Sequence, residues 1–134
     1  TPCNGGDGDM STMTIPGVLP GMNEIIEAAR GNKYASSKQK KEYTDMIAWT
    51  AKAARIPHME RIDITFRWYE PDRRRDKDNI MAGTKFIMDG LVKAGIIKND
   101  GWAQIGDISH LFSVDRHNPR VEVELTETEE ARDL

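Results

Sequence analysis

The residues from Glu70 to Asp100, EPDRRRDKDNIMAGTKFIMDGLVKAGIIKND, decide both the fold and the chemistry of this chain. The stretch opens with three arginines and continues with two aspartates, Asp76 and Asp78. An apolar pattern of helical period follows and closes at Gly95, before a polar turn. Carboxylates flanked by basic side chains can hold a hard cation beside a phosphate. The stretch therefore indicates metal-assisted phosphodiester chemistry on nucleic acid.

The segments on either side predict the strands and helices of a single small α+β domain. Residues 62–69 alternate apolar and polar side chains, as a half-buried strand does. Other segments carry apolar side chains at three- and four-residue spacing, which is the pattern of one helix face. The expected strands are 13–18, 62–69, 105–115 and 121–126, and the expected helices are 23–31, 36–55 and 79–94.

The order of these elements, β-α-α-β-α-β-β, favours a mixed sheet covered by helices. Turn residues at 116–119 separate the last two strands, so these strands are expected to form a hairpin. Ile108, Phe112 and Val114 are candidate core residues of the first strand of that hairpin. The alternation of residues 62–69 also predicts that Trp68 lies in the core.

Length and composition limit the classes of protein to consider. The 134 residues give room for one domain, expected at 13–127. Residues 1–12 predict a disordered leader, and the acidic residues 128–134 predict a frayed tail. No apolar run is long enough to cross a membrane and no signal peptide is visible, so a cytoplasmic setting without a membrane partner is expected. The single cysteine, Cys3, excludes an internal disulfide framework.

The distribution of charge matters more than its total of −3. Between Arg30 and Arg120 the chain has 18 Lys and Arg against 12 Asp and Glu, so the acidity gathers at the two ends. A basic middle section can steer the chain towards a polyanion such as nucleic acid. The same charges also fit an ordinary solvated surface.

Asp76 and Asp78 are the candidate metal ligands. In an extended segment their spacing places both carboxylates on one side, where they repel each other unless a cation lies between them. Mg²⁺ suits such a pair because it takes oxygen ligands and retains waters that a substrate phosphate can replace. The turn beyond the helix is expected to bring Asp100 back beside them as a third ligand. Lys85 lies two helical turns after Asp78 and could stabilise charge on the phosphate.

A purely structural role fits the same residues. An Asp-x-Asp-Asn sequence before a helix often caps the helix, with the acidic side chains favoured by the helix dipole. The arginines would then only neutralise the aspartates. Asp89 is better explained as an ion-pair partner of Lys85 or Lys93, at four-residue spacing, than as a metal ligand.

Several short motifs together resemble one known family. They are DRRRDKDN at residues 72–79, KFIMDGL at 85–91, Lys93-Ala94-Gly95, Asn99-Asp100 and RVEVELTE at 120–127. In combination they resemble the RusA-like Holliday junction resolvases of bacteria and their phages. Residues 20–23 and 34–43 are similar to the N-terminal half of that family in a looser way. The likeness extends from about Ile15 to Glu127.

The resemblance implies a homodimeric, magnesium-dependent endonuclease that resolves four-way DNA junctions by paired nicks, with Mn²⁺ as a possible substitute metal. It implies that Asp76, Asp78 and Asp100 are catalytic and hold the metal, and that Lys85 is the catalytic lysine. The spacing of the lysine differs from that of the family: the position that the lysine usually occupies is Ala82 in this chain, and Lys85 follows three residues later. An insertion between Asn79 and Lys85 accounts for the difference. The resemblance also implies a cytoplasmic enzyme of a bacterial host or a phage.

The basic residues around the two aspartates then gain a role. Arg73, Arg74, Arg75 and Lys77 are expected to bind phosphates, which gives affinity without reading base sequence. Trp68, Trp102 and Tyr69 are candidates for stacking on opened bases, although the strand pattern favours core burial for Trp68. The displaced lysine leaves open a non-catalytic protein of the same fold that binds junctions or other DNA for a phage. A nuclease or phosphatase acting on other nucleic acids or nucleotides is a third class.

Overall fold

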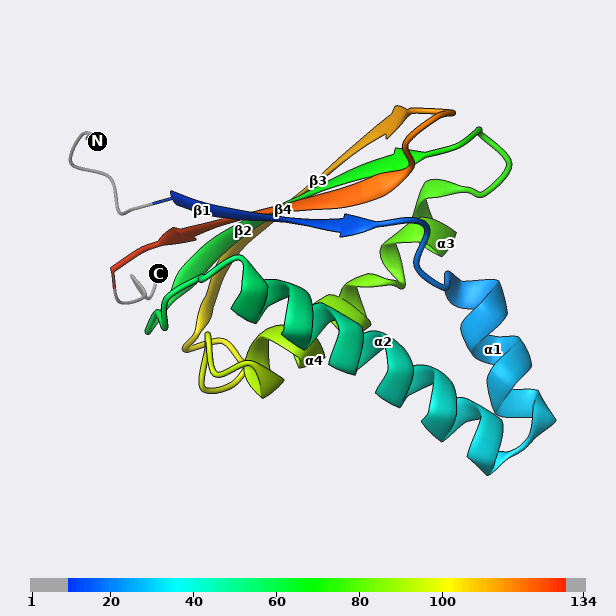
Figure 1. Cartoon of the computed structure of the whole chain (residues 1–134), viewed down its shortest axis with the longest axis horizontal. Coiled ribbons are helices and arrows are strands. Elements are labelled where there is room, and N and C mark those ends of the chain that lie inside the picture. Colours follow the sequence, from blue (N-terminus) through cyan, green and yellow to red (C-terminus); the bar gives the residue numbers. More distant parts are fainter. Residues whose placement is uncertain (1–9, 130–134) are drawn as a thin grey trace.

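The computed structural model describes residues 10–129, and their elements follow the predicted order, with the third predicted helix divided in two (Figure 1). The strands are β1 (Met10–Pro16), β2 (Ile62–Glu70), β3 (Ile105–Val114) and β4 (Arg120–Glu127). The helices are α1 (Met22–Gly31), α2 (Lys33–Ala53), α3 (Lys77–Met81) and α4 (Thr84–Lys93). Strand β1 begins ahead of the predicted domain start at Met13. The rest of the predicted leader, 1–9, and most of the predicted tail, 130–134, lie outside the described residues.

The four strands form one mixed sheet in the order β1-β4-β2-β3. Strand β2 pairs with β3 in parallel and with β4 antiparallel, and β4 pairs with β1 antiparallel. The predicted hairpin of β3 and β4 is wrong, because β2 lies between these two strands. The turn residues at 116–119 carry the chain across the end of β2, so they reverse the direction of the chain without making its flanking strands neighbours. Every second side chain of β2 is buried, as a central strand requires.

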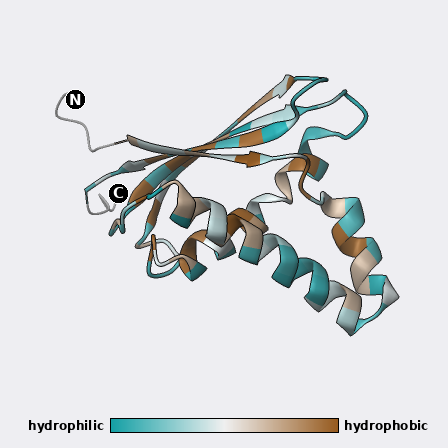
Figure 2. Ribbon diagram, viewed as in Figure 1, coloured by the Kyte–Doolittle hydropathy of each residue, from teal (hydrophilic) through white to brown (hydrophobic). Residues whose placement is uncertain are grey.

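The core lies between the sheet and the helices α2 and α4, which cover one of its faces (Figure 1). Trp68 is 1% exposed, so its predicted place in the core is confirmed. Helices α2 and α4 pack closely at Gly90, where an added Cβ would lie 2.5 Å from Cγ2 of Ile47. Figure 2 shows hydrophilic residues along much of the first half of α2 and apolar residues in the strands and α4. Among the described residues, no helix is long and apolar enough to span a membrane.

Strand β3 is an edge of the sheet and is only partly covered. Of its predicted core residues, Phe112 packs against the core, but Ile108 and Val114 are 48% and 47% exposed. The prediction is wrong for those two residues. They share a sheet face with the buried residues Ile64 and Glu70 of β2, but the edge strand is poorly covered by the helix layer.

The predicted helix at 79–94 breaks between α3 and α4. The break falls at Ala82 and Gly83, inside the region of the insertion inferred from the lysine spacing. Gly83 lies against the segment that joins β1 to α1: a Cβ there would be 3.2 Å from Cβ of Leu19 and 3.4 Å from the carbonyl oxygen of Pro20. The break therefore lets this linker pass close to the backbone between the two helices.

Candidate active site

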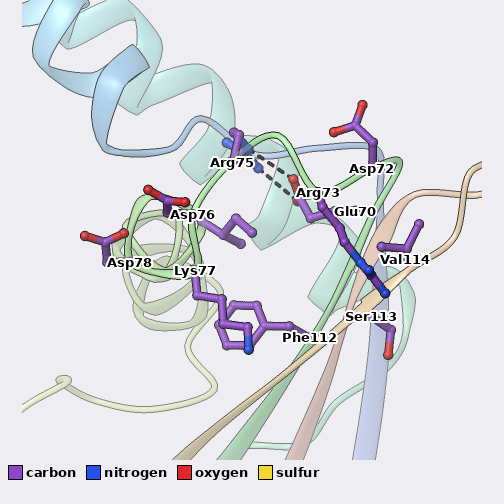
Figure 3. Close-up of a pocket in the computed structure, with 11 residues that line it drawn as sticks. Glu70, Asp72, Arg73, Arg75, Asp76, Lys77, Asp78, Phe112, Ser113 and Val114 are labelled. Carbon is purple, nitrogen blue, oxygen red and sulfur yellow. Dashed lines mark hydrogen bonds and ion pairs between the residues drawn. The ribbon is translucent and has the colours of Figure 1, made fainter.

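A pocket of about 640 Å³ opens where the parallel strands β2 and β3 end and α3 begins (Figure 3). The end of β2, the loop after it and the start of α3 supply one side, and the end of β3 supplies the other. The lining residues are Glu70, Asp72, Arg73, Arg75, Asp76, Lys77, Asp78, Ile80, Phe112, Ser113 and Val114. Except for Arg74, all the acidic and basic residues at the start of the decisive stretch of sequence line this pocket.

Asp76 and Asp78 both line this pocket. Asp76 occupies the N-cap position of α3 in an extended conformation, but its side chain makes no capping hydrogen bond. Asp78 lies in the first turn, where its Oδ1 accepts a hydrogen bond of 2.9 Å from the backbone N–H of Asn79. The two carboxylates point in the same direction in Figure 3. Because the Asp76 carboxylate is not used for capping, the purely structural explanation does not account for it.

Arg75 is held inside the fold. Its guanidinium forms a bidentate ion pair with Glu70, with Nε–Oε1 and Nη2–Oε2 distances of 3.0 and 2.9 Å (Figure 3). Its Nη1 also donates to the carbonyl oxygen of Leu19 at 3.0 Å and to Oε1 of Glu24 at 3.3 Å. Glu70 is only 7% exposed and is the single buried charged residue in the described part of the chain. This network ties the loop that carries Asp76 to the end of β2 and to the start of α1.

The other predicted phosphate contacts lie on the surface. Arg73 and Lys77 are exposed and line the pocket, and the Lys77 amine lies 5.5 Å from the centre of the Phe112 ring. Arg74 points into solvent, with 90% of its side chain exposed, and makes a 3.6 Å ion pair with Asp72. Three of the four basic residues therefore remain accessible to a phosphate, while Arg75 already has internal partners.

Lys85 is separated from the two aspartates by the helix break. It lies in the first turn of α4, outside the pocket, and its amine is 3.3 Å from the carboxylate of Asp89. Asp89 also lies 3.9 Å from the amine of Lys40 on α2. The pairing of Asp89 with Lys85 confirms the structural role predicted for Asp89.

Asp100 does not converge with Asp76 and Asp78 within one chain. It lies in the connection from α4 to β3, which is anchored beside the start of β2: Met59 N–H donates to Ile96 O and Ile62 N–H to Gln104 O. The pocket is at the other end of β2, and nine residues of strand span about 26 Å. Accordingly, the described residues contain no group of three His, Cys, Asp or Glu side chains placed to hold a metal.

The expected convergence fails for a topological reason. Strands β2 and β3 are parallel, so the chain must return along α4 to the starting end of β2 before β3 can begin. A residue that precedes β3 is therefore at the opposite end of the sheet from a residue that follows β2.

Sequence reasoning missed several residues of the pocket. Glu70 continues the buried phase of β2, after Ile62, Ile64, Phe66 and Trp68, so the alternation itself could have placed its side chain facing the helices. Phe112, Ser113 and Val114 had no such signal, because their presence depends on β3 pairing in parallel with β2.

Phe112, which lines the pocket, belongs to a stack of aromatic rings on β2 and β3. The ring of His110 lies 5.0 Å from that of Phe66, and its Nδ1 accepts a 2.9 Å hydrogen bond from the Trp68 indole N–H. Partial burial lowers the pKa of His110. The neutral ring is thus favoured, as an acceptor for the indole requires.

A family of known proteins matches the sequence that builds this fold and this pocket. The family described as Endodeoxyribonuclease RusA matches residues 17–126, which include the whole pocket. The chain belongs to the RusA endodeoxyribonuclease family. The resemblance seen in the sequence motifs is therefore confirmed, and the chain is an endodeoxyribonuclease of the Holliday junction resolvase class. A comparison with curated proteins finds no match. In this RusA-family chain, the pocket at the ends of β2 and β3 is the candidate active site.

Proposed function

We propose that this RusA-family enzyme cuts four-way DNA junctions by magnesium-dependent hydrolysis at the pocket lined by Asp76 and Asp78. The proposal rests on one observation: the Asp76 carboxylate makes no capping hydrogen bond to α3 and lines an accessible pocket together with Asp78. The donors fit the ion, since Mg²⁺ is usually held by one or two carboxylates together with waters and substrate phosphate oxygens.

The residues around the pair have separate roles in this proposal. Asp76 and Asp78 hold the metal, which when bound activates a water and offsets charge on the scissile phosphate. Arg73 and Lys77, both exposed at the pocket, bind the phosphates on either side of the cleaved bond, and Arg74 adds to the local positive charge. Arg75 positions the loop through Glu70 instead of binding DNA directly.

Two copies of the chain give Asp100 a way to reach the pocket. Strand β3 is a sheet edge, and in the described part of the chain no strand pairs with its outer side. Ile108 and Val114 on one face of this strand, and Leu111 on the other, are each about half exposed, and a partner paired with the edge would cover part of their surface. If two copies pair their β3 edges antiparallel about a two-fold axis, the start of one β3 lies beside the end of the other.

Such a homodimer brings the partner's α4–β3 connection towards Phe112, Ser113 and Val114, which line the pocket. We therefore propose that Asp100 acts in the site of the partner copy. The dimer then has two pockets, as paired nicking of a junction needs. Lys85, which lies outside the pocket, is retained as a proposed catalytic residue that a DNA-bound state must bring closer.

The Asp76→Asn variant tests the metal role. We expect cleavage of a labelled four-way junction to be lost, while junction binding persists or strengthens because a negative charge near phosphate is removed. Mn²⁺ binding, followed by electron paramagnetic resonance, is expected to weaken in parallel. Glu27→Gln, which removes an exposed carboxylate on α1 outside the pocket, serves as the control.

Two results would count against this assignment. If Asp76→Asn cleaved the junction at the wild-type rate, this carboxylate would have no role in the mechanism. Junction binding by the wild-type protein, without cleavage in any divalent cation, would instead support the non-catalytic protein.

A further inference from the structure

Trp102 is the most exposed large apolar side chain in the described part of the chain, at 95%. The other two tryptophans differ from it: Trp68 is buried, and Trp49 is 73% exposed on the outer side of α2. Burying an aromatic side chain is one of the larger favourable contributions to folding, and this fold leaves Trp102 without that contribution. A fully presented indole is typical of a surface that binds a partner.

The backbone beneath Trp102 is firmly held, so the exposure is not that of a loose loop. The Arg61 guanidinium donates to the carbonyl oxygens of Trp102 and Ala103 at 2.9 and 3.4 Å. The N–H groups of Gln104 and Ile105 both donate to the carbonyl oxygen of Gly101, at 3.1 and 3.0 Å. The side chain is thereby presented to solvent at a fixed place, just before β3.

The neighbours of Trp102 connect it to the proposed nuclease site. Asp100, the proposed ligand, lies two residues earlier in the same turn, and the exposed Lys98 lies just before that. A DNA strand that brings a phosphate to Asp100 must pass within reach of Trp102. One short segment thus offers an ammonium, a carboxylate and an indole, the groups that can contact a nucleotide backbone and its base.

The other aromatic candidates for base stacking are occupied. Trp68 is in the core and donates its indole N–H to His110. The face of Tyr69 is covered by the Arg120 guanidinium, 3.8 Å from the ring centre. Of the three aromatic residues that the sequence suggested for stacking, only Trp102 has a free ring.

We propose that Trp102 stacks on an unpaired base at the branch point of the junction and thereby favours branched over continuous duplex DNA. The inference rests on the proposed function and assigns part of its substrate preference. In a continuous duplex the faces of each base are covered by neighbouring bases, whereas bases at a branch point can be unstacked. Stacking on an indole does not depend on the identity of the base, which suits an enzyme that recognises shape.

Binding measurements on matched variants test this role. The dissociation constants of Trp102→Ala, Trp102→Phe and Trp49→Ala are measured for a four-way junction and for a duplex of equal length. We expect Trp102→Ala to weaken junction binding by about 5- to 150-fold, the range for loss of one base–aromatic stack, with little change for the duplex. Trp102→Phe is expected to retain part of the preference, and Trp49→Ala all of it.

Fluorescence gives a second readout that does not depend on cleavage. In a Trp49→Phe background the emission comes from buried Trp68 and exposed Trp102, so quenching by acrylamide reports mainly on Trp102. We expect strong quenching in the free protein and protection on addition of the junction. A 2-aminopurine at the branch point is expected to lose fluorescence in the complex with wild-type protein and not with Trp102→Ala.

The outcomes separate the inference from the proposed function. A wild-type preference for junctions that survives in Trp102→Ala would overturn the stacking role alone. Protection of Trp102 before any DNA is added would place it in a protein interface and would also overturn that role. If the wild-type protein itself shows no preference for junctions, the proposed function and the inference both fail.

Discussion

At the scale of single residues, Arg74 and Arg75 show how neighbours of one type can have different roles. In the sequence they are equivalent members of a basic run. In the structure Arg74 is exposed, while Arg75 is 18% exposed and makes a bidentate pair with Glu70. The difference arises because Glu70 lies in the buried phase of β2, and a buried carboxylate needs a charged partner.

Arg75→Ala is therefore expected to act on stability first. Removing one partner of a buried ion pair leaves the other charge uncompensated, which costs about 3–5 kcal/mol. We expect a loss of that order in the free energy of unfolding, measured by denaturant titration. Arg74→Ala, the adjacent control, is expected to change it by less than about 0.5 kcal/mol. Unchanged stability in Arg75→Ala, together with weaker DNA binding, would show that Arg75 contacts phosphate instead.

His58 is expected to make the stability of the chain depend on pH. Its Nδ1 lies 2.9 Å from Gly95 O and its Nε2 lies 2.8 Å from Glu60 Oε2, so both ring nitrogens face acceptors. The hydrogen bond to Gly95, followed by that to Glu60, raises the pKa of His58 above 6.5. The stabilising contribution is complete below the unfolded-state pKa of 6.5 and is lost as pH rises through the higher folded-state pKa.

The measurement is the melting temperature of wild type and His58→Gln between pH 5.5 and 9. The wild-type advantage is expected to shrink as pH rises, because the unprotonated ring can donate to only one of its two acceptors. A difference in melting temperature that stays constant over this range would rule out the charged form as the stabilising species.

At the scale of elements, the packing of α2 against α4 depends on Gly90. A Cβ at this position would lie 2.5 Å from Cγ2 and 2.8 Å from Cβ of Ile47, so the two helices must move apart to accept it. We expect Gly90→Ala to lower the free energy of unfolding by about 1–3 kcal/mol, in spite of the better helix propensity of alanine. Gly31→Ala is the control, because its nearest neighbour would be 3.9 Å away. A stabilised Gly90→Ala would show that the helices adjust freely.

The elements themselves were well predicted from the sequence, because they depend on local patterns. The alternation at 62–69 identified β2. The break between α3 and α4 was not predicted, although it falls where the displaced lysine had indicated an insertion. Helix starts were less accurate. Helix α2 begins at Lys33, ahead of the predicted Ser36, because Asn32 Oδ1 caps it by accepting from Ala35 N–H at 2.7 Å.

At the scale of the whole molecule, two predictions failed for one reason. The predicted hairpin required β3 to be a neighbour of β4, and the predicted convergence of Asp100 with Asp76 required β3 to begin near the end of β2. In the structure β3 instead pairs in parallel with β2, and β2 separates it from β4. Tertiary packing determines which strands pair, and the sequence of β3 contains no local pattern that specifies its partner strand. The pair Asp76 and Asp78 was predictable because both belong to one short segment.

Mixed dimers test whether Asp100 serves the partner's pocket. A heterodimer of one Asp76→Asn chain and one Asp100→Asn chain, isolated with two affinity tags, would contain one pocket with both native carboxylates and one with neither. We expect this heterodimer to nick one strand of a junction, although each parent homodimer is inactive. If each pocket used the Asp100 of its own chain, the heterodimer would have no complete site and would be inactive.

The reciprocal heterodimer gives the opposite expectation and completes the argument. When a chain carrying both Asp76→Asn and Asp100→Asn pairs with a wild-type chain, sharing between copies leaves each pocket with one native and one altered carboxylate. We therefore expect no nicking from it, whereas sites built within single chains would leave the wild-type copy active. Activity in the first heterodimer and its absence in the second can arise only if the acidic residues at opposite ends of β2 and β3 meet across the dimer. Full cleavage by the Asp100→Asn homodimer would instead show that Asp76 and Asp78 act without Asp100.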